Sequence, residues 1–145
     1  MEDLDSFEEP KPKYIVRRYL AGFIDYSIVY FITFLLVFIL GTPDDEYTYH
    51  LNGLPALIPV LFWFLFIVCL ETWFGATVGN TIVQLKPVTF SGYSKKISFG
   101  QSFKRHLLDP IDMFLFGVIG IVIIKTSDKN QRLGDIWAKT TVTKY

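Results

Sequence analysis

An almost uncharged apolar run near the start of the chain limits what the chain can fold into. Tyr19 to Leu40 is more than twenty residues long and contains one charged side chain, Asp25. A helix needs ~20 apolar residues at ~1.5 Å each to cross the hydrocarbon of a bilayer. The run therefore predicts a transmembrane helix. A carboxylate inside such a helix is costly unless it is paired, neutralised or hydrated, which makes Asp25 a candidate functional residue.

The residues just before Asp25 predict which side of this helix is packed. Arg18 precedes Asp25 by seven residues, nearly two helical turns, so the two side chains share a face. Ala21 and Gly22 lie on the turn between them and are small enough to let a neighbouring helix approach closely. The sequence therefore predicts a helix contact on the Arg18–Asp25 face.

The composition agrees with a small integral membrane protein. The chain has 145 residues, of which 51% are hydrophobic and 17% aromatic, and its mean hydropathy is +0.36. Basic and acidic residues number 14 each, so no global positive field favours nucleic acid as a partner. One cysteine, Cys69, and two distant histidines, His50 and His106, give neither a disulfide within the chain nor a metal cluster. We predict no enzyme, because no nucleophile and base stand out, and no cofactor.

A second apolar run completes the predicted pair of membrane spans. Residues 1–13 are charged and are expected to form a mobile cytoplasmic tail, followed by one membrane domain over 14–145. The polar loop 41–53 ends the first helix. Leu54 to Trp73 is again long enough to cross the bilayer and is uncharged until Glu71. The chain thus has two predicted transmembrane helices joined by an acidic loop.

The distribution of lysine and arginine predicts the orientation. Four of the 14 precede the first helix, none lies between the two helices, five lie in 86–105 and five in 125–144. The positive-inside rule places the N-terminus in the cytoplasm and the acidic loop outside. We expect the cell's plasma (inner) membrane.

The third apolar run is too short for a simple crossing. Ile111 to Ile124 would make about 21 Å of helix. Two arrangements fit: a single helix that starts earlier, near Ser98, or a broken helix that enters and returns. Asp109-Pro110 supplies a break, because proline disfavours a helical residue before it. We favour the returning arrangement, because the charge rule then holds everywhere.

The polar segments around this run predict two further elements. Ile97 to Leu108 has apolar residues at helical spacing, so we expect an amphipathic helix on the membrane surface. Its basic residues, with those just before it, would contact anionic headgroups: Lys95, Lys96, Lys104 and Arg105. Segments 85–90 and 140–143 are β-prone and can pair as a short cytoplasmic hairpin if they share a side, with Ser91-Gly92 as a turn signal. His50 and His106 are expected on the surface. The predicted fold class is therefore an all-α membrane protein.

Four motifs occur in order along the chain. They are Arg18-x-x-Ala21-x-x-x-Asp25, then Gly75-Ala76-Thr77-Val78-Gly79, then a lone Arg105, and then Arg132-Leu133-Gly134-Asp135 followed by Ala138-Lys139-Thr140-Thr141-Val142. In these motifs residues 14–145 resemble the RDD family of small membrane proteins, which is named for an arginine and two aspartates. The resemblance implies that the naming residues are Arg18, Asp25 and Asp135. Relatives usually have lysine after the glycine at 79, where this chain has Asn80. Transport or ion exchange has been suggested for some members.

Eight charged residues form the predicted functional cluster: Arg18, Asp25, Glu71, Arg105, Asp109, Asp112, Arg132 and Asp135. Most lie at the cytoplasmic ends of the three apolar runs, so we expect them to meet near the inner leaflet. The hypothesis is that Asp25, with one of Glu71, Asp109 or Asp112, takes up a proton or small cation such as Na⁺ from the cytoplasm. Arg18 and Arg105 would set its pKa.

Structural roles compete with this hypothesis. Asp25 could pair with Arg18 or Arg105 only to hold helices together, and Glu71 could reach interfacial water. Asp109 and Asp112 could be a helix cap and a solvated turn residue. Asp135 could cap a helix start after Gly134.

Two functions follow from the sequence. The first is a small multi-spanning protein that moves or senses a cation or proton, as an oligomer because so few helices cannot enclose a pathway. The alternative is a non-transporting scaffold that binds another membrane protein through its small and polar faces. Nucleotide binding is not expected, because the Gly75–Gly79 stretch lacks the spacing and the lysine of a P-loop.

Overall fold

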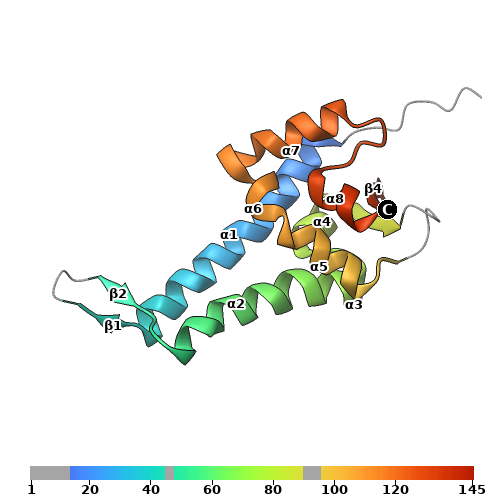
Figure 1. Cartoon of the computed structure of the whole chain (residues 1–145). Coiled ribbons are helices and arrows are strands. Elements are labelled where there is room, and N and C mark those ends of the chain that lie inside the picture. Colours follow the sequence, from blue (N-terminus) through green and yellow to red (C-terminus); the bar gives the residue numbers. More distant parts are fainter. Residues whose placement is uncertain (1–13, 45–47, 90–95) are drawn as a thin grey trace, which may run out of the picture.

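The computed structural model describes residues 14–44, 48–89 and 96–145. The predicted tail 1–13, the turn signal Ser91-Gly92 and Lys95 lie outside these residues. Within them, two helices are long and apolar enough to cross a membrane, Ile15–Leu40 and Leu54–Phe74. Both predicted spans are therefore confirmed, and the rest of the chain is mostly helical with two small strand pairs (Figure 1).

The first span is the single helix α1, Ile15–Leu40. Its buried residues Ala21, Asp25 and Val29 follow one another at four-residue spacing, so they form one narrow packed stripe. Large side chains elsewhere on α1 are exposed, including Phe31, Phe34 and Phe38. A helix with apolar side chains outside and a carboxylate inside is the pattern expected in lipid rather than in water.

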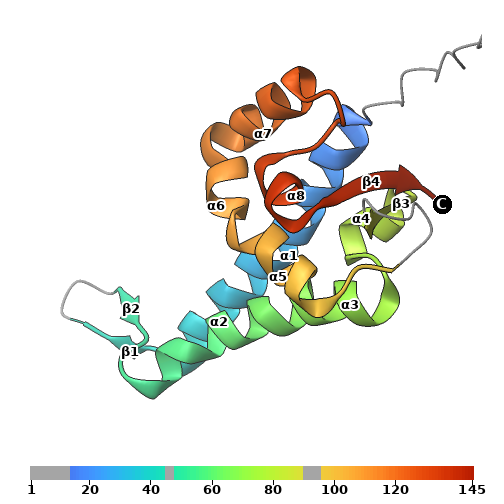
Figure 2. The same cartoon turned by 45° about the vertical axis from the view of Figure 1, so that its right-hand side comes forward.

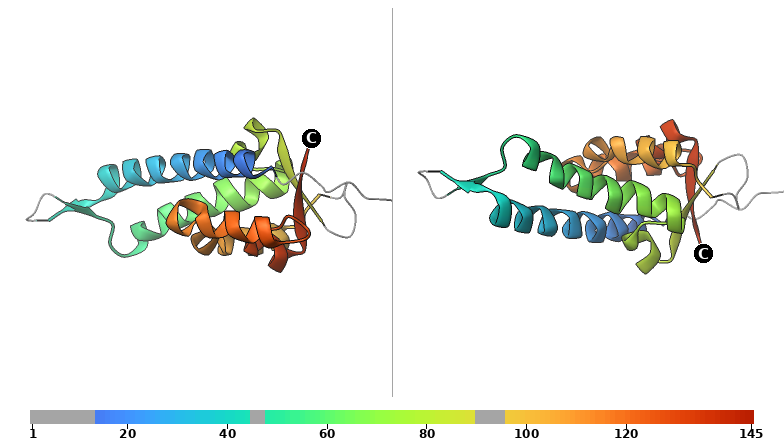
Figure 3. Two further views of the ribbon diagram at one scale, coloured as in Figure 1. Left: turned by 90° about the horizontal axis from the view of Figure 1, so that it is seen from above. Right: turned by 90° about the horizontal axis from the view of Figure 1, so that it is seen from below.

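A short hairpin joins the two spans. It consists of β1, Thr42–Pro43, and β2, Tyr49–His50, which pair antiparallel. Figure 3 shows this hairpin at one end of the molecule and the C-terminal strand at the other. The polar loop is thus held away from the buried charges.

The second span changes its helical type along its length. It runs through the 3₁₀ turn η1, Leu54–Ala56, and α2, Leu57–Trp63, then the π-helical η2, Phe64–Cys69, and α3, Leu70–Phe74. The wider π turn changes the backbone hydrogen bonding near the buried Glu71. The Val68 carbonyl accepts the Thr72 hydroxyl at 2.8 Å and the Ser102 hydroxyl at 3.2 Å. The span is thereby tied to a later helix.

A small helix packs on the stripe of α1. This is α4, Val78–Ile82, which is followed by strand β3, Leu85–Thr89. A Cβ placed on Gly79 would lie 2.1 Å from the Ala21 carbonyl oxygen, so only glycine permits the observed approach. The predicted helix contact at Ala21 is therefore made by α4.

The third apolar segment is broken and returns. It consists of α5, Phe99–Leu107, α6, Asp109–Asp112, and α7, Phe114–Thr126. Figures 1 and 2 show α7 running back toward the start of α1. A hydrogen bond from Arg18 to the Asn130 carbonyl joins the two ends. The structure therefore has the returning arrangement.

Helix α5 is present as predicted, but its polar side is buried and its apolar side is exposed. A capping box of Ser98 and Gln101 begins it. Its polar side chains at positions 102, 105 and 106 are buried, whereas Phe99 and Leu107 are exposed. The prediction that Arg105 contacts headgroups and that His106 lies on the surface was wrong, because these side chains find counter-charges inside the protein.

The C-terminal segment closes the fold. Helix α8, Leu133–Ala138, packs on α5, and a Cβ on Gly134 would lie 2.3 Å from the Arg105 carbonyl oxygen. Strand β4, Thr140–Lys144, pairs antiparallel with β3, with Thr140 opposite Thr89. The predicted strand pair is thus present, and it joins the middle of the chain to its end.

Candidate functional site

All eight predicted charged residues lie in one layer where α1, α3, α5, α6 and α8 meet. Six of them are buried: Asp25, Glu71, Arg105, Asp109, Asp112 and Asp135. Arg18 and Arg132 are partly exposed. The layer lies toward the end of the molecule opposite the β1–β2 hairpin (Figure 1). The structure thus brings these residues together, and their individual partners distinguish them.

Asp135 is surrounded by guanidinium groups. Its carboxylate lies against Arg18 Nη2, 3.0 Å from Arg105 Nη1 and 3.7 Å from Arg132 Nε. It also accepts the Arg132 backbone N–H at 3.2 Å, so it serves the start of α8 as well. Burial alone would raise the pKa of Asp135, but the guanidiniums of Arg105, Arg18 and Arg132 outweigh burial and lower it.

Two further ion pairs extend from this centre. Arg105 Nη2 lies 3.5 Å from Glu71 Oε1, and Arg132 Nη1 lies 2.8 Å from Asp109 Oδ1. The second oxygens of Glu71 and Asp109 both contact the ring of His106. We call the resulting set the ion-pair network: Arg18, Glu71, Arg105, His106, Asp109, Arg132 and Asp135.

Sequence reasoning missed His106. It is 5% exposed, with Nδ1 2.6 Å from Asp109 Oδ2 and Nε2 3.0 Å from Glu71 Oε2. Burial alone would lower the pKa of His106, but the carboxylates of Glu71 and Asp109 raise it to about 9. The available signal was its position three residues before Asp109 on a helix, where the two side chains are neighbours.

Asp25 stands apart from the ion-pair network. It makes no ion pair with any residue that the structure describes. Its Oδ2 accepts the Thr77 hydroxyl at 2.6 Å and its Oδ1 accepts the Gly79 N–H at 2.7 Å. The predicted pairing of Asp25 with Arg18 or Arg105 was wrong, because both arginines bind Asp135 instead.

Asp112 resembles Asp25 in its role. It is buried rather than solvated, and its two oxygens accept the backbone N–H groups of Leu133 and Gly134 at 3.1 and 3.0 Å. It therefore caps α8 from a different element, as Asp25 caps α4. Arg132 Nε lies 3.9 Å from Asp112, at the limit of an ion pair.

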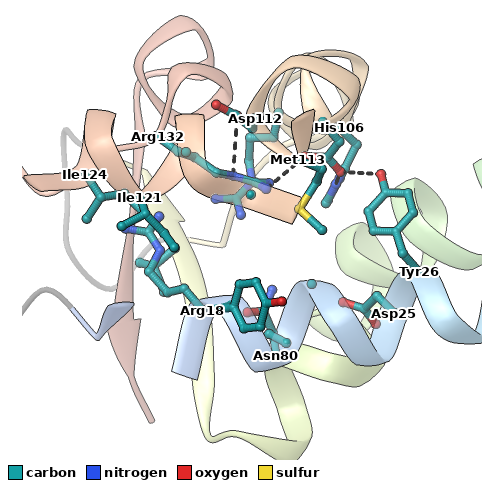
Figure 4. Close-up of a pocket in the computed structure, with 18 of the residues that line it drawn as sticks. Arg18, Asp25, Tyr26, Asn80, His106, Asp112, Met113, Ile121, Ile124 and Arg132 are labelled. Atoms are coloured by element: carbon teal, nitrogen blue, oxygen red, sulfur yellow. Dashed lines mark hydrogen bonds and ion pairs between the residues drawn. The ribbon is translucent and has the colours of Figure 1, made fainter. Parts of the chain in front are cut away.

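A cavity of about 70 Å³ lies between α1 and the α5–α7 segment. Figure 4 shows Arg18 and Asp25 on the α1 side and Asp112, Met113 and Arg132 across from them. One water needs roughly 10–15 Å³ of such space, so the cavity can hold a small ion with several waters. In the described part of the chain, no group of three or more His, Cys, Asp or Glu side chains could hold a metal ion.

The charges around the cavity nearly cancel. Among the described residues, the buried carboxylates are Asp25, Glu71, Asp109, Asp112 and Asp135. Arg18, Arg105, Arg132 and a protonated His106 provide one positive charge fewer than these acids provide negative charges. The ion pairs identify the unmatched acid as Asp25.

Comparison with known protein families gave a match. A family profile described as "RDD family" matches residues 13–139. Comparison with curated proteins and with solved structures gave no significant match. The matched range includes the Arg18–Asp25 face, the Gly75–Gly79 stretch, Arg105 and the start of α8. With this match and its two apolar spans, the chain belongs to the RDD family of integral membrane proteins.

Proposed function

We propose that this protein binds a small monovalent cation, a proton or Na⁺, at Asp25 and exchanges it across the membrane. The observation that carries the proposal is a carboxylate that is 4% exposed, borders a cavity and has no ion pair among the described residues. Two hydrogen-bond donors hold it in place but bring no positive charge. An unmatched buried charge costs several kcal/mol, which a bound cation would offset.

The size of the cavity supports a small ion over an organic substrate. Pockets for drug-sized ligands measure roughly 300–1,000 Å³, whereas this cavity measures about 70 Å³. Its walls are mixed, with Asn80 and Arg18 beside Met113, Ile121 and Ile124. Further polar side chains border it, including Tyr26, His106 and Asp109.

The proposal includes the setting of the protein. The positive-inside rule favours a cytoplasmic location for the start of α1 and the end of β4, in the plasma membrane. Two long spans do not enclose a pathway through the apolar half of the molecule, so we propose that copies of the chain assemble to form it. Cross-linking in native membranes would test the assembly.

A flux assay on reconstituted protein tests the proposal. Proteoliposomes are given a Na⁺ gradient or a pH gradient, and internal pH is followed with a dye. We expect flux in the wild type and its loss in Asp25→Asn. Asp128→Asn is the matched control, because Asp128 is an exposed acid in the loop after α7.

Each outcome decides between the functions. A folded Asp25→Asn protein that transports like the wild type would refute the cation site. A wild type with no H⁺ or Na⁺ flux would favour the non-transporting scaffold. Circular dichroism of each variant verifies that it is folded.

A further inference from the structure

His106 is held between two acids that come from different elements. Its Nδ1 lies 2.6 Å from Asp109 Oδ2 on α6, and its Nε2 lies 3.0 Å from Glu71 Oε2 on α3. An ionised carboxylate only accepts hydrogen bonds, and a neutral imidazole has one N–H. Two such contacts need two protons, so these three side chains hold one proton more than a neutral ring and two carboxylates.

The surroundings keep that proton on the ring. Arg132 Nη1 lies 2.8 Å from the other oxygen of Asp109, and Arg105 Nη2 lies 3.5 Å from the other oxygen of Glu71. The shared oxygens also accept hydroxyl groups, from Tyr26 at 2.6 Å on Asp109 and from Ser102 at 2.7 Å on Glu71. Donors and guanidiniums favour ionised carboxylates, so the ring is the group that stays protonated.

This protonated ring borders the same cavity as Asp25. His106, Asp109 and Asp25 all line the cavity. The charged and titratable groups around His106 are Asp25 and Tyr26 from α1, Glu71 from α3, Arg105 from α5, Asp109 from α6, and Arg132 before α8. The cavity therefore offers a proton that leaves the ring a route to water.

We propose that Glu71, His106 and Asp109 form a proton-binding site, separate from Asp25, that releases its proton when a cation occupies the cavity. The release rests on the proposed cation site, whereas the bound proton rests on the geometry of His106 alone. No covalent bond other than the N–H bond of the imidazolium breaks in this step. One proton leaves the imidazolium, and one cation enters the cavity.

Electrostatic repulsion gives the reason for the coupling. A cation at Asp25 adds a positive charge to a layer that is poorly screened, and it weakens the hold of His106 on its proton. Because linkage is reciprocal, raising the pH should tighten cation binding, by at most about tenfold per pH unit for one proton per cation.

Nitrogen NMR of the histidine ring tests the proposal on the full chain in detergent. The chain has two histidines, so His50→Gln, in the exposed β1–β2 hairpin, leaves His106 as the single signal. We expect both ring nitrogens to be protonated at pH 7 and to titrate near pH 9. Adding NaCl should move this titration to lower pH, whereas choline chloride at equal ionic strength should not. Asp25→Asn should abolish the movement.

The outcomes separate the two proposals. A neutral ring at pH 7 would overturn the proton site. A protonated ring whose titration ignores Na⁺, in a protein whose Na⁺ flux requires Asp25, would overturn the release while leaving the proposed function intact. If Asp25→Asn changes neither flux nor the His106 titration, the cation site itself is refuted.

Discussion

Asp25 of α1 and Asp135 of α8 lie in the same buried layer but have different partners. Asp135 has three guanidinium groups around its carboxylate, and it joins α1, α5 and α8 electrostatically. Asp25 has a hydroxyl and a backbone N–H from the start of α4. Guanidinium groups cancel the charge of their acid, whereas a hydroxyl and a backbone N–H hold a carboxylate without cancelling its charge. The comparison therefore assigns cohesion to Asp135, whereas Asp25 is the residue at which we propose that a cation binds.

The largest expected effect comes from removing the centre of the ion-pair network. Asp135→Ala leaves the buried Arg105 and the partly buried Arg18 without their shared acid, which should lower the free energy of unfolding by ~3–5 kcal/mol. Thermal unfolding in detergent measures this, with Asp128→Ala as the exposed control. If Asp135→Ala loses no more stability than the control, Asp135 does not hold the helices together.

The ion-pair network should also carry the pH dependence of stability. The pKa of His106 is raised to about 9 from an ordinary 6.5, so protonation of His106 stabilises the folded state. This contribution is fully present below about pH 6.5 and is lost as the pH rises through about 9. A difference of this size corresponds to on the order of 3 kcal/mol. Unfolding temperatures of wild type and His106→Gln across pH 6–10 should converge at high pH. Parallel curves would contradict the prediction.

The contact that positions Asp25 depends on glycine. Gly79→Ala places a Cβ 2.1 Å from the Ala21 carbonyl oxygen, so α4 must move and stability should fall by ~1–3 kcal/mol. Gly100→Ala is the matched control, because a Cβ there meets nothing within 4 Å. Equal unfolding temperatures for the two variants would mean that α4 is not held against α1.

The smallest effect on stability is expected from a substitution of Asp25. Asp25→Asn keeps an oxygen for the Gly79 N–H, and the Thr77 hydroxyl can rotate to accept from the new amide. Stability should therefore fall by no more than ~1 kcal/mol, the net value of one hydrogen bond. The same unfolding assay applies. If Asp25→Asn proves as damaging as Asp135→Asn, the two aspartates have the same role.

Periodicity and length predicted the parts of this fold that depend on neighbours in the chain. The run Tyr19–Leu40 is long enough to span, Asp109-Pro110 breaks the third apolar segment, and Leu85–Thr89 pairs with Thr140–Lys144. The charge distribution favoured the returning arrangement, and the structure has it. Each of these inferences uses residues within one segment or a rule about sides of the membrane.

Which charged side chains pair with one another could not be predicted in the same way. Arg18 and Asp25 share a face of α1, yet Arg18 binds Asp135, because Gly134 lets α8 approach α5 closely. The helix that carries His106 has apolar residues at positions 99, 103 and 107, and this spacing predicts a helix on the membrane surface. In lipid that apolar side faces outward, so the buried side is the polar one. Which face is inside depends on the solvent, and spacing alone does not identify it.

The two members of the Arg18–Asp135 pair are 117 residues apart in the chain. During translation, the first membrane helix leaves the ribosome long before its acid partner has been made. Strand β4, which pairs with β3, is completed later still. The contact between α1 and α8 and the pairing of β3 with β4 can therefore form only after the C-terminal segment has been synthesised.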